Sequence, residues 1–134
     1  MIRIVVGFFK AIGTLPKPWW GWIGLLMLVN MILPFLFIDR IEARVVLAAF
    51  LVAAAIQMAM FRALGFVRLL GLGHLIAWGP LEIWLVLRLG EIGLDGLLGL
   101  WLATVVAVNG ISLVIDIVDV VRFLGGEREP GYVL

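Results

Sequence analysis

Few side chains in this sequence are able to do chemistry, and two of the strongest candidates lie between Gly71 and Arg88. This segment holds the only histidine of the chain, His74, and a carboxylate, Glu82, among otherwise apolar residues. At about 100° per residue, His74, Trp78 and Glu82 share one face of a helix. An ionisable group inside a membrane is costly unless it is paired or hydrated, so it marks a candidate functional site. The pattern makes both residues candidates for proton transfer.

When the apolar segments are aligned in one bilayer as helices with a rise of about 1.5 Å per residue, their polar residues fall at two membrane depths, which form two layers. The outer layer lies a turn or so inside one membrane surface, and the middle layer lies nearer the bilayer centre. Groups in one layer are expected to converge, because polar groups in lipid must satisfy one another. The outer layer contains Gln57, His74 and Asp116, and the middle layer contains Asn30, Glu82 and Asn109.

Structural roles compete with a functional role for most of these groups. Asp116 and Asp119 precede Arg122 near the end of an apolar segment, which favours an intrahelical ion pair. Arg88 and Glu91 are expected to form a similar pair. A histidine in a helix bundle is often neutral and hydrogen-bonded, and an asparagine often joins two helices, so ordinary packing roles are also open for His74 and Asn30.

Glu82 is the acid that a structural role explains least well. No basic residue lies within one helical turn of it, since Arg88 is six positions away. Pro80 disturbs the backbone beside it, because proline cannot donate a backbone hydrogen bond. If Glu82 is structural, it should be protonated or held by a fixed donor such as Asn30, Asn109 or an indole.

The string His74-Leu-Ile-Ala-Trp78 resembles the HxxxW gate of the influenza proton channel. In that channel the histidine relays protons and the tryptophan restricts the exit, so the resemblance implies a relay role for His74 and a gate role for Trp78. The resemblance covers five residues of one helix. The acid that follows here, Glu82, stands one position later than the aspartate of that pattern, and Gly79-Pro80 lies between.

The composition is that of a membrane protein. Of the 134 residues, 65% are hydrophobic and 14% are charged, and the mean hydropathy is +1.24. A water-soluble fold has too little interior to hide so much apolar surface. The net charge of +1 gives no indication of a nucleic-acid partner. With no cysteine and one histidine, the chain is not expected to bind a metal ion by itself.

Four largely uncharged segments are each long enough to cross about 30 Å of hydrocarbon as a helix. They are residues 19–38, 45–65, 69–89 and 97–123. Residues 1–15 predict an amphipathic helix in the membrane interface rather than a cleaved signal peptide, and residues 124–134 predict a polar tail. The expected fold is therefore all-α. It is one membrane domain, 1–134, in which a short interfacial amphipathic helix precedes four transmembrane helices in a bundle.

Proline and small residues predict the shape and packing of these helices. Pro34 cannot donate to the carbonyl of Asn30, so a bend is expected in the first span, and Gly79-Pro80 predicts a break in the third. Small residues four apart let helix backbones approach closely, so two stripes are expected at helix contacts. The stripes are Ala49, Ala53, Ala55, Ala59 and Ala63 in the second span, and Gly99, Ala103 and Ala107 in the fourth.

The distribution of basic residues predicts the orientation. With four spans, the side that carries the termini receives seven of the ten lysines and arginines. These are Arg3, Lys10, Lys17, Arg62, Arg68, Arg122 and Arg128, whereas the other side has Arg40, Arg44 and Arg88. Basic residues favour the cytoplasmic side, so both termini are expected in the cytoplasm, and the membrane is expected to be a bacterial inner membrane.

The favoured function is that of a structural or accessory subunit that packs against other membrane subunits in the lipid bilayer. The alternative is a homo-oligomeric proton or ion channel or transporter that uses Glu82, His74 and Asp116, with the polar stripe of the last span facing the oligomer axis. An enzyme acting on a lipid or quinone is not expected, because the only serine is Ser112 and no nucleophile-base motif is present. The cofactor is unknown, because apolar cofactor pockets in helix bundles look like ordinary packing in a sequence.

Overall fold

The four apolar segments form long helices that pack together, and each is long and apolar enough to cross a membrane. The computed structural model describes residues 1–127, in which a short N-terminal helix precedes these four spans. The all-α fold class is therefore confirmed. The spans are Lys17–Phe37, Ile41–Leu64, Arg68–Ile92 and Leu97–Leu124.

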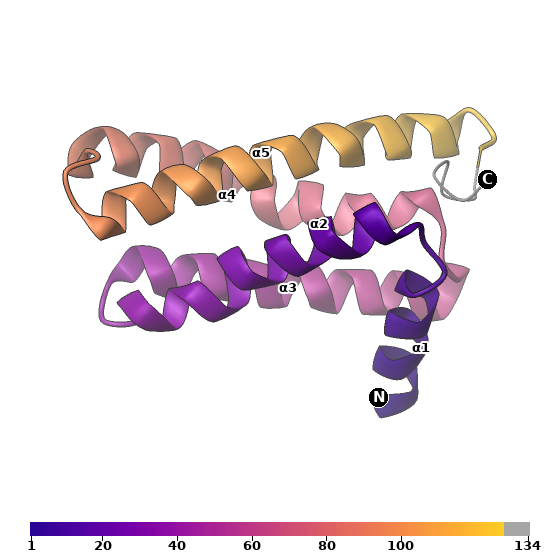
Figure 1. Ribbon diagram of the computed structural model, residues 1–134. Coiled ribbons are helices and arrows are strands. Elements are labelled where there is room, and N and C mark those ends of the chain that lie inside the picture. Colours follow the sequence, from indigo (N-terminus) through magenta and orange to yellow (C-terminus); the bar gives the residue numbers. More distant parts are fainter. Residues whose placement is uncertain (128–134) are drawn as a thin grey trace.

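Figure 1 shows the four spans side by side along one axis. The connections 38–40 and 93–96 lie at one end, which we call the distal end. The connections 13–16 and 65–67 and the end of the last helix lie at the opposite end, which we call the terminal end. Both ends of the described chain are therefore on the same side of the bundle.

The first span is not a regular α-helix, and its irregularity lies around Pro34. It consists of α2 (Lys17–Met27), the π-helix η1 (Leu28–Ile32) and the 3-10 helix η2 (Leu33–Phe37). The N–H of Leu33 bonds the carbonyl of Leu28, five residues earlier. Around Pro34 the structure thus shows a change of helix type, which begins six residues before the proline.

The second and third spans differ from their predicted limits where charged residues occur. Helix α3 (Ile41–Leu64) begins four residues before the predicted start at 45 and includes Glu42 in its first turn. Helix α4 (Leu72–Ile92) follows the short 3-10 helix η3 (Arg68–Gly71) and continues through Pro80. The predicted break at Gly79-Pro80 is therefore wrong. Proline removes one hydrogen bond, and packing of α4 against α3 and α5 (Leu97–Leu124) maintains the helix around it.

Helix α1 (Ile2–Ile12) runs across the axis of the four spans, as Figure 1 shows. Its Phe8 packs edge-to-face on Phe61 of α3 and on Phe66, with ring centroids 5.6 and 6.2 Å apart. The indole of Trp20 donates to the carbonyl of Ile12, which ties the end of α1 to α2. A short amphipathic helix with this direction suits a position along the membrane surface.

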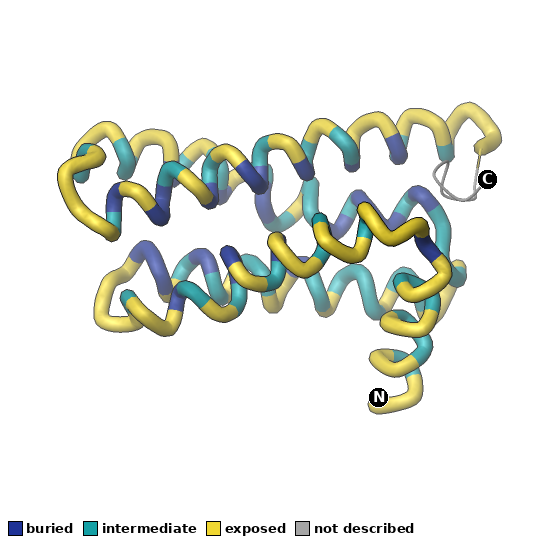
Figure 2. Tube along the Cα trace, viewed as in Figure 1, coloured by how far each residue is buried: buried dark blue, intermediate teal, exposed yellow. Residues whose placement is uncertain are grey.

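The centre of the bundle is formed by large apolar side chains from α4 and α5, above all Trp78, Leu85 and Leu102. Figure 2 shows the buried residues on the inward sides of the spans and exposed residues along their outer sides. The exposed surface is rich in large apolar residues, as expected of a surface that faces lipid. The predicted polar tail 124–134 is described only as far as Glu127, and the remaining residues, Arg128 included, lie outside the described chain.

The small-residue stripes take two different roles. Ala53 is buried against α4, as predicted, but Ala55, Ala59 and Ala63 are exposed on the outer side of α3. Gly99 is buried at the first turn of α5, where an added Cβ would collide with the carbonyl oxygen of Gly93. Ala107 of the same helix is exposed. The prediction that both stripes lie wholly at contacts within the bundle is therefore wrong.

Candidate functional site

A histidine–carboxylate pair joins α4 to α5 in the predicted outer layer. His74 Nδ1 lies 2.9 Å from Asp116 Oδ2, and the imidazole stacks on Trp78 with ring centroids 4.1 Å apart. Gly71 makes this close approach possible, because a Cβ there would lie 2.9 Å from Asp116 Oδ1. The structure thus brings together two of the three outer-layer candidates, and His74 and Trp78 form one stacked unit.

The third outer-layer candidate, Gln57, has a structural contact. Its Nε2 donates to the carbonyl of Leu70 at 3.2 Å, which attaches α3 to η3. Gly73 allows α4 to lie against it, because a Cβ at that position would be 2.7 Å from Gln57 Cγ. Gln57 therefore lies beside the His74–Asp116 pair and fixes the neighbouring backbone.

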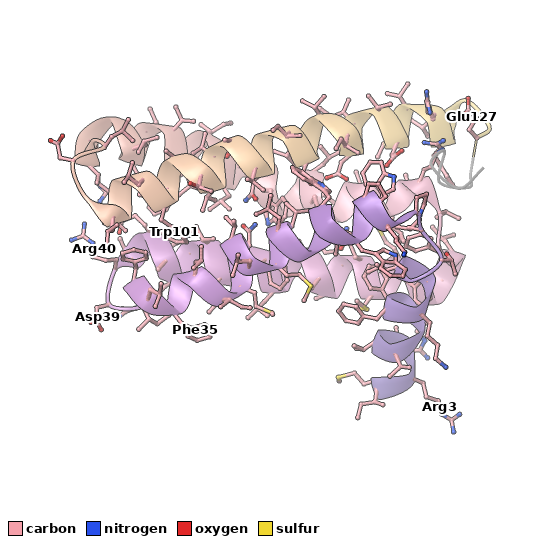
Figure 3. The ribbon with its side chains drawn as sticks, in the orientation of Figure 1. Arg3, Phe35, Asp39, Arg40, Trp101 and Glu127 are labelled. Atoms are coloured by element: carbon pink, nitrogen blue, oxygen red, sulfur yellow. The ribbon has the colours of Figure 1, made fainter. Side chains whose placement is uncertain are left out.

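A buried ion pair closes the terminal end. Arg68 Nη1 lies 2.6 Å from Asp119 Oδ1, and the exposed fractions of the two side chains are 3% and 11%. Glu127 adds a longer contact of 3.6 Å to Arg68 Nη2, and Figure 3 shows Glu127 at this end of the bundle. The predicted intrahelical pairing of Asp116 and Asp119 with Arg122 is replaced by contacts with His74 and Arg68 from other elements.

The middle layer contains a reciprocal amide pair. Asn30 and Asn109 donate to each other's side-chain oxygens, and both distances are 2.8 Å. Asn30 also donates to the carbonyl of Leu26, and the indole of Trp101 donates to the carbonyl of Val29 at 3.1 Å. These bonds join the irregular part of the first span to α5. The structure thus places Asn30 and Asn109 together, in the interhelical role considered from the sequence.

Glu82 is the middle-layer candidate that lacks a partner among the residues that the structure describes. Its Oε1 is buried and has no hydrogen-bond partner among residues 1–127, and the same is true of Trp78 Nε1 one turn earlier. Its other oxygen, Oε2, lies over Gly110, where an added Cβ would be 2.9 Å away. Asn30, Asn109 and the Trp101 indole, which were expected to be able to hold it, bond elsewhere.

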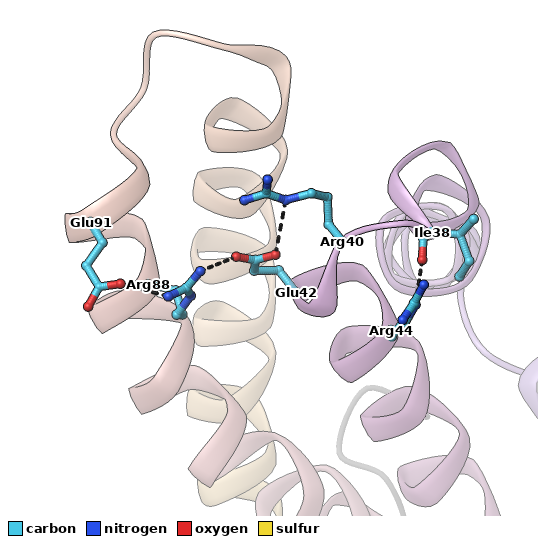
Figure 4. Close-up of polar contacts among 6 residues, drawn as sticks. All are labelled: Ile38, Arg40, Glu42, Arg44, Arg88 and Glu91. Carbon is cyan, nitrogen blue, oxygen red and sulfur yellow. Dashed lines mark hydrogen bonds and ion pairs between the residues drawn. The ribbon is translucent and has the colours of Figure 1, made fainter.

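Sequence reasoning missed a further buried acid, Glu42, at the distal end. Figure 4 shows its carboxylate between Arg88 of α4, at 2.6 Å, and Arg40, at 3.5 Å. Its side chain is fully buried. Arg88 also bonds Glu91, which confirms the predicted pair. A signal was present in the sequence, because Glu42 and Arg88 lie at the same membrane depth in neighbouring spans.

A cavity of about 180 Å³ lies at the terminal end beside the His74–Asp116 pair. Its walls come from all four spans, from α1 and from the connection that precedes η3. His74, Trp78, Gln57, Arg68 and Asp116 contribute to these walls. The outer-layer residues Gln57, His74 and Asp116 therefore surround a common space.

The polar groups as a whole form separate clusters that face the inside of one chain. Asn109, Ser112, Asp116 and Asp119, the polar stripe of α5, are all buried within their own bundle. Within residues 1–127, no three His, Cys, Asp or Glu side chains are close enough to hold a metal ion. Comparison of the chain with protein-family models, with curated proteins and with solved structures found no match.

Proposed function

We propose that this integral membrane protein acts as a structural or accessory subunit, packing in the bilayer against other membrane subunits or a second copy of itself. One observation carries the proposal: the outward stripe of small residues on α3. Ala55, Ala59 and Ala63 are exposed in the single chain and follow one another at intervals of four. Such a stripe lets the backbone of another helix approach closely.

Two further features support this role. The charged and amide groups inside the spans are largely satisfied within the chain, as in the Arg68–Asp119 and Asn30–Asn109 contacts. The connections 38–40, 65–67 and 93–96 are short, so little surface is available outside the bilayer. A partner would therefore be met mainly through the lipid-facing sides of the helices.

Ala59→Leu is expected to weaken association with the partner while the chain stays folded, because the larger side chain holds the two helices apart. We expect the dissociation constant to rise by roughly tenfold, which is about 1.4 kcal/mol. Native electrophoresis and sedimentation in mild detergent would measure the size of the complex. Val86→Leu, at an exposed position of α4 that belongs to neither small-residue stripe, is the control. Assembly of Ala59→Leu at wild-type affinity would contradict the proposed contact.

We infer that both termini lie in the cytoplasm and that the membrane is a bacterial inner membrane. Basic residues support this orientation, since Arg3, Lys10, Lys17, Arg62 and Arg122 lie toward the terminal end. Cysteines placed singly at Thr14 and at Glu127 should react with an impermeant reagent only from the cytoplasmic side. Reaction of both from the outside would reverse the orientation.

A proton or ion pathway is the second candidate, and unpaired Glu82 favours it. A buried carboxylate oxygen without a donor is costly, and such groups mark ion pathways in membranes. The inward direction of the α5 stripe favours the accessory role instead, because a channel on an oligomer axis would need these groups to face outward. Glu82→Gln keeps the shape of the side chain and removes its charge, and so separates the two roles.

A further inference from the structure

The cavity at the terminal end has the size of a small ring compound. Its volume is about 180 Å³. A protein cavity of about 150 Å³ with apolar walls holds benzene, so this one has room for a six-membered ring with small substituents. It is also formed by residues of α1 and α2, where the chain is expected to lie near the membrane surface. A ligand dissolved in the bilayer would meet it there.

Aromatic side chains supply much of the wall. Phe8 and Phe9 come from α1, Trp19 and Trp22 from the start of the first span, and Phe50 from α3. Aromatic rings attract a planar ring through stacked or edge-to-face contacts. The wall therefore favours a flat, largely apolar head group over a flexible alkyl chain.

The polar side of the wall offers a hydrogen-bonding group through His74. Its Nδ1 bonds Asp116, whereas no bond from His74 Nε2 to another described residue is present. Arg68 and Trp78 also belong to the wall, but Arg68 Nε and Trp78 Nε1 are enclosed by neighbouring atoms and do not face the cavity. The second ring nitrogen of His74 suits a ligand with a carbonyl or hydroxyl oxygen on its ring.

The charges around the cavity are already balanced. Asp119 and Glu127 lie against Arg68, and His74 lies against Asp116. A charged ligand would disturb these buried pairs, whereas a neutral ligand would leave them intact.

We propose that the cavity between α1, α2, α3, α4 and α5 binds a neutral single-ring compound of the quinone, quinol or phenol class. The ring lies among the aromatic side chains, and a ring oxygen bonds His74. The proposal goes beyond the accessory role and does not depend on it, because the stripe of Ala59 is on the outer side of α3.

The test uses the purified full chain in mild detergent with two probes, decyl-substituted dimethoxy-methyl-benzoquinone and the same ring without the decyl chain. Quinones quench indole fluorescence, and Trp19, Trp22 and Trp78 lie in the wall. We expect saturable quenching and a higher melting temperature, since a ligand that binds the folded state stabilises it. Saturation by both probes identifies recognition of the ring itself, whereas saturation by the decyl form alone would show that the alkyl chain supplies the binding and would overturn the proposal.

Two variants locate the binding in the cavity. Ala54→Phe fills the space and His74→Phe keeps a ring on Trp78 but removes its nitrogens, so each should weaken binding by roughly tenfold or more. Ala107→Phe, on the exposed side of α5, should bind as the wild type does. If Ala54→Phe does not fold, the binding measurement on His74→Phe still tests the proposal. Quenching that never saturates, or that is equal in folded Ala54→Phe or His74→Phe and in Ala107→Phe, would overturn the proposal.

Discussion

Arg68→Met is expected to lower the free energy of unfolding by about 3–5 kcal/mol, because it leaves a charge buried without its partner. The guanidinium is 3% exposed and lies 2.6 Å from Asp119 Oδ1. Methionine matches the alkyl part of arginine, so packing is largely retained and the change falls on the ion pair. Unfolding followed by circular dichroism in mixed micelles of increasing denaturing detergent would measure the loss.

The double variant Arg68→Met/Asp119→Leu should regain most of this stability, because replacing both partners of a buried pair by apolar residues is often neutral. Arg62→Met is the matched control, since Arg62 is exposed at the same end of the bundle. A double variant as unstable as Arg68→Met alone would show that the arginine acts through packing rather than through Asp119.

Glu82→Gln is expected to reduce proton flux to that of empty vesicles if the acid carries protons, and to leave the folded chain unchanged. The amide has nearly the same shape, and the carboxylate oxygen Oε1 has no donor to lose within the described chain. Reconstituted vesicles with an imposed pH gradient and a potassium clamp would measure the flux. Glu91→Gln is the control, because that side chain is exposed at the distal end.

Three outcomes of this flux measurement are possible, and they separate the candidate functions. Flux in the native protein that Glu82→Gln abolishes and Glu91→Gln preserves would establish Glu82 as part of a pathway. No flux above that of empty vesicles from the native protein, in its verified oligomeric state, would make Glu82 a structural acid and leave the accessory role. Flux that survives in Glu82→Gln would remove this residue from the pathway.

The sequence was sufficient to predict the helices, because a span of lipid requires a length and a hydrophobicity that composition records directly. The prediction was wrong where contacts between helices override the preference that a residue has by itself. Glu42 would be expected at a polar helix end, yet Arg88 and Arg40 allow it to be buried inside the bundle. Pro80 would be expected to break α4, yet packing on both sides keeps the helix continuous.

For the candidate site, the sequence predicted the membrane depth of each polar residue but did not predict all of its contacts. Counting residues along each span placed His74 with Asp116 and Asn30 with Asn109, and both pairs are in contact. Glu82 shares the middle depth but does not reach the amides, because depth does not fix the rotation of a helix about its own axis. For the same reason, the sequence could not predict that Ala59 lies on the exposed side of α3.

The contact between Glu42 and Arg88 also bears on the order in which the chain is assembled. The short distal connections divide the molecule into two helical hairpins, the first made by the first span and α3, the second by α4 and α5. Glu42 belongs to the first and Arg88 to the second, so they meet only after both hairpins are in the membrane. Until then, Arg40 can form an ion pair with Glu42, and Glu91 can form one with Arg88. Each hairpin thus brings its own counter-charge, and docking adds a shared contact between Glu42 and Arg88 to the two local pairs, which both remain.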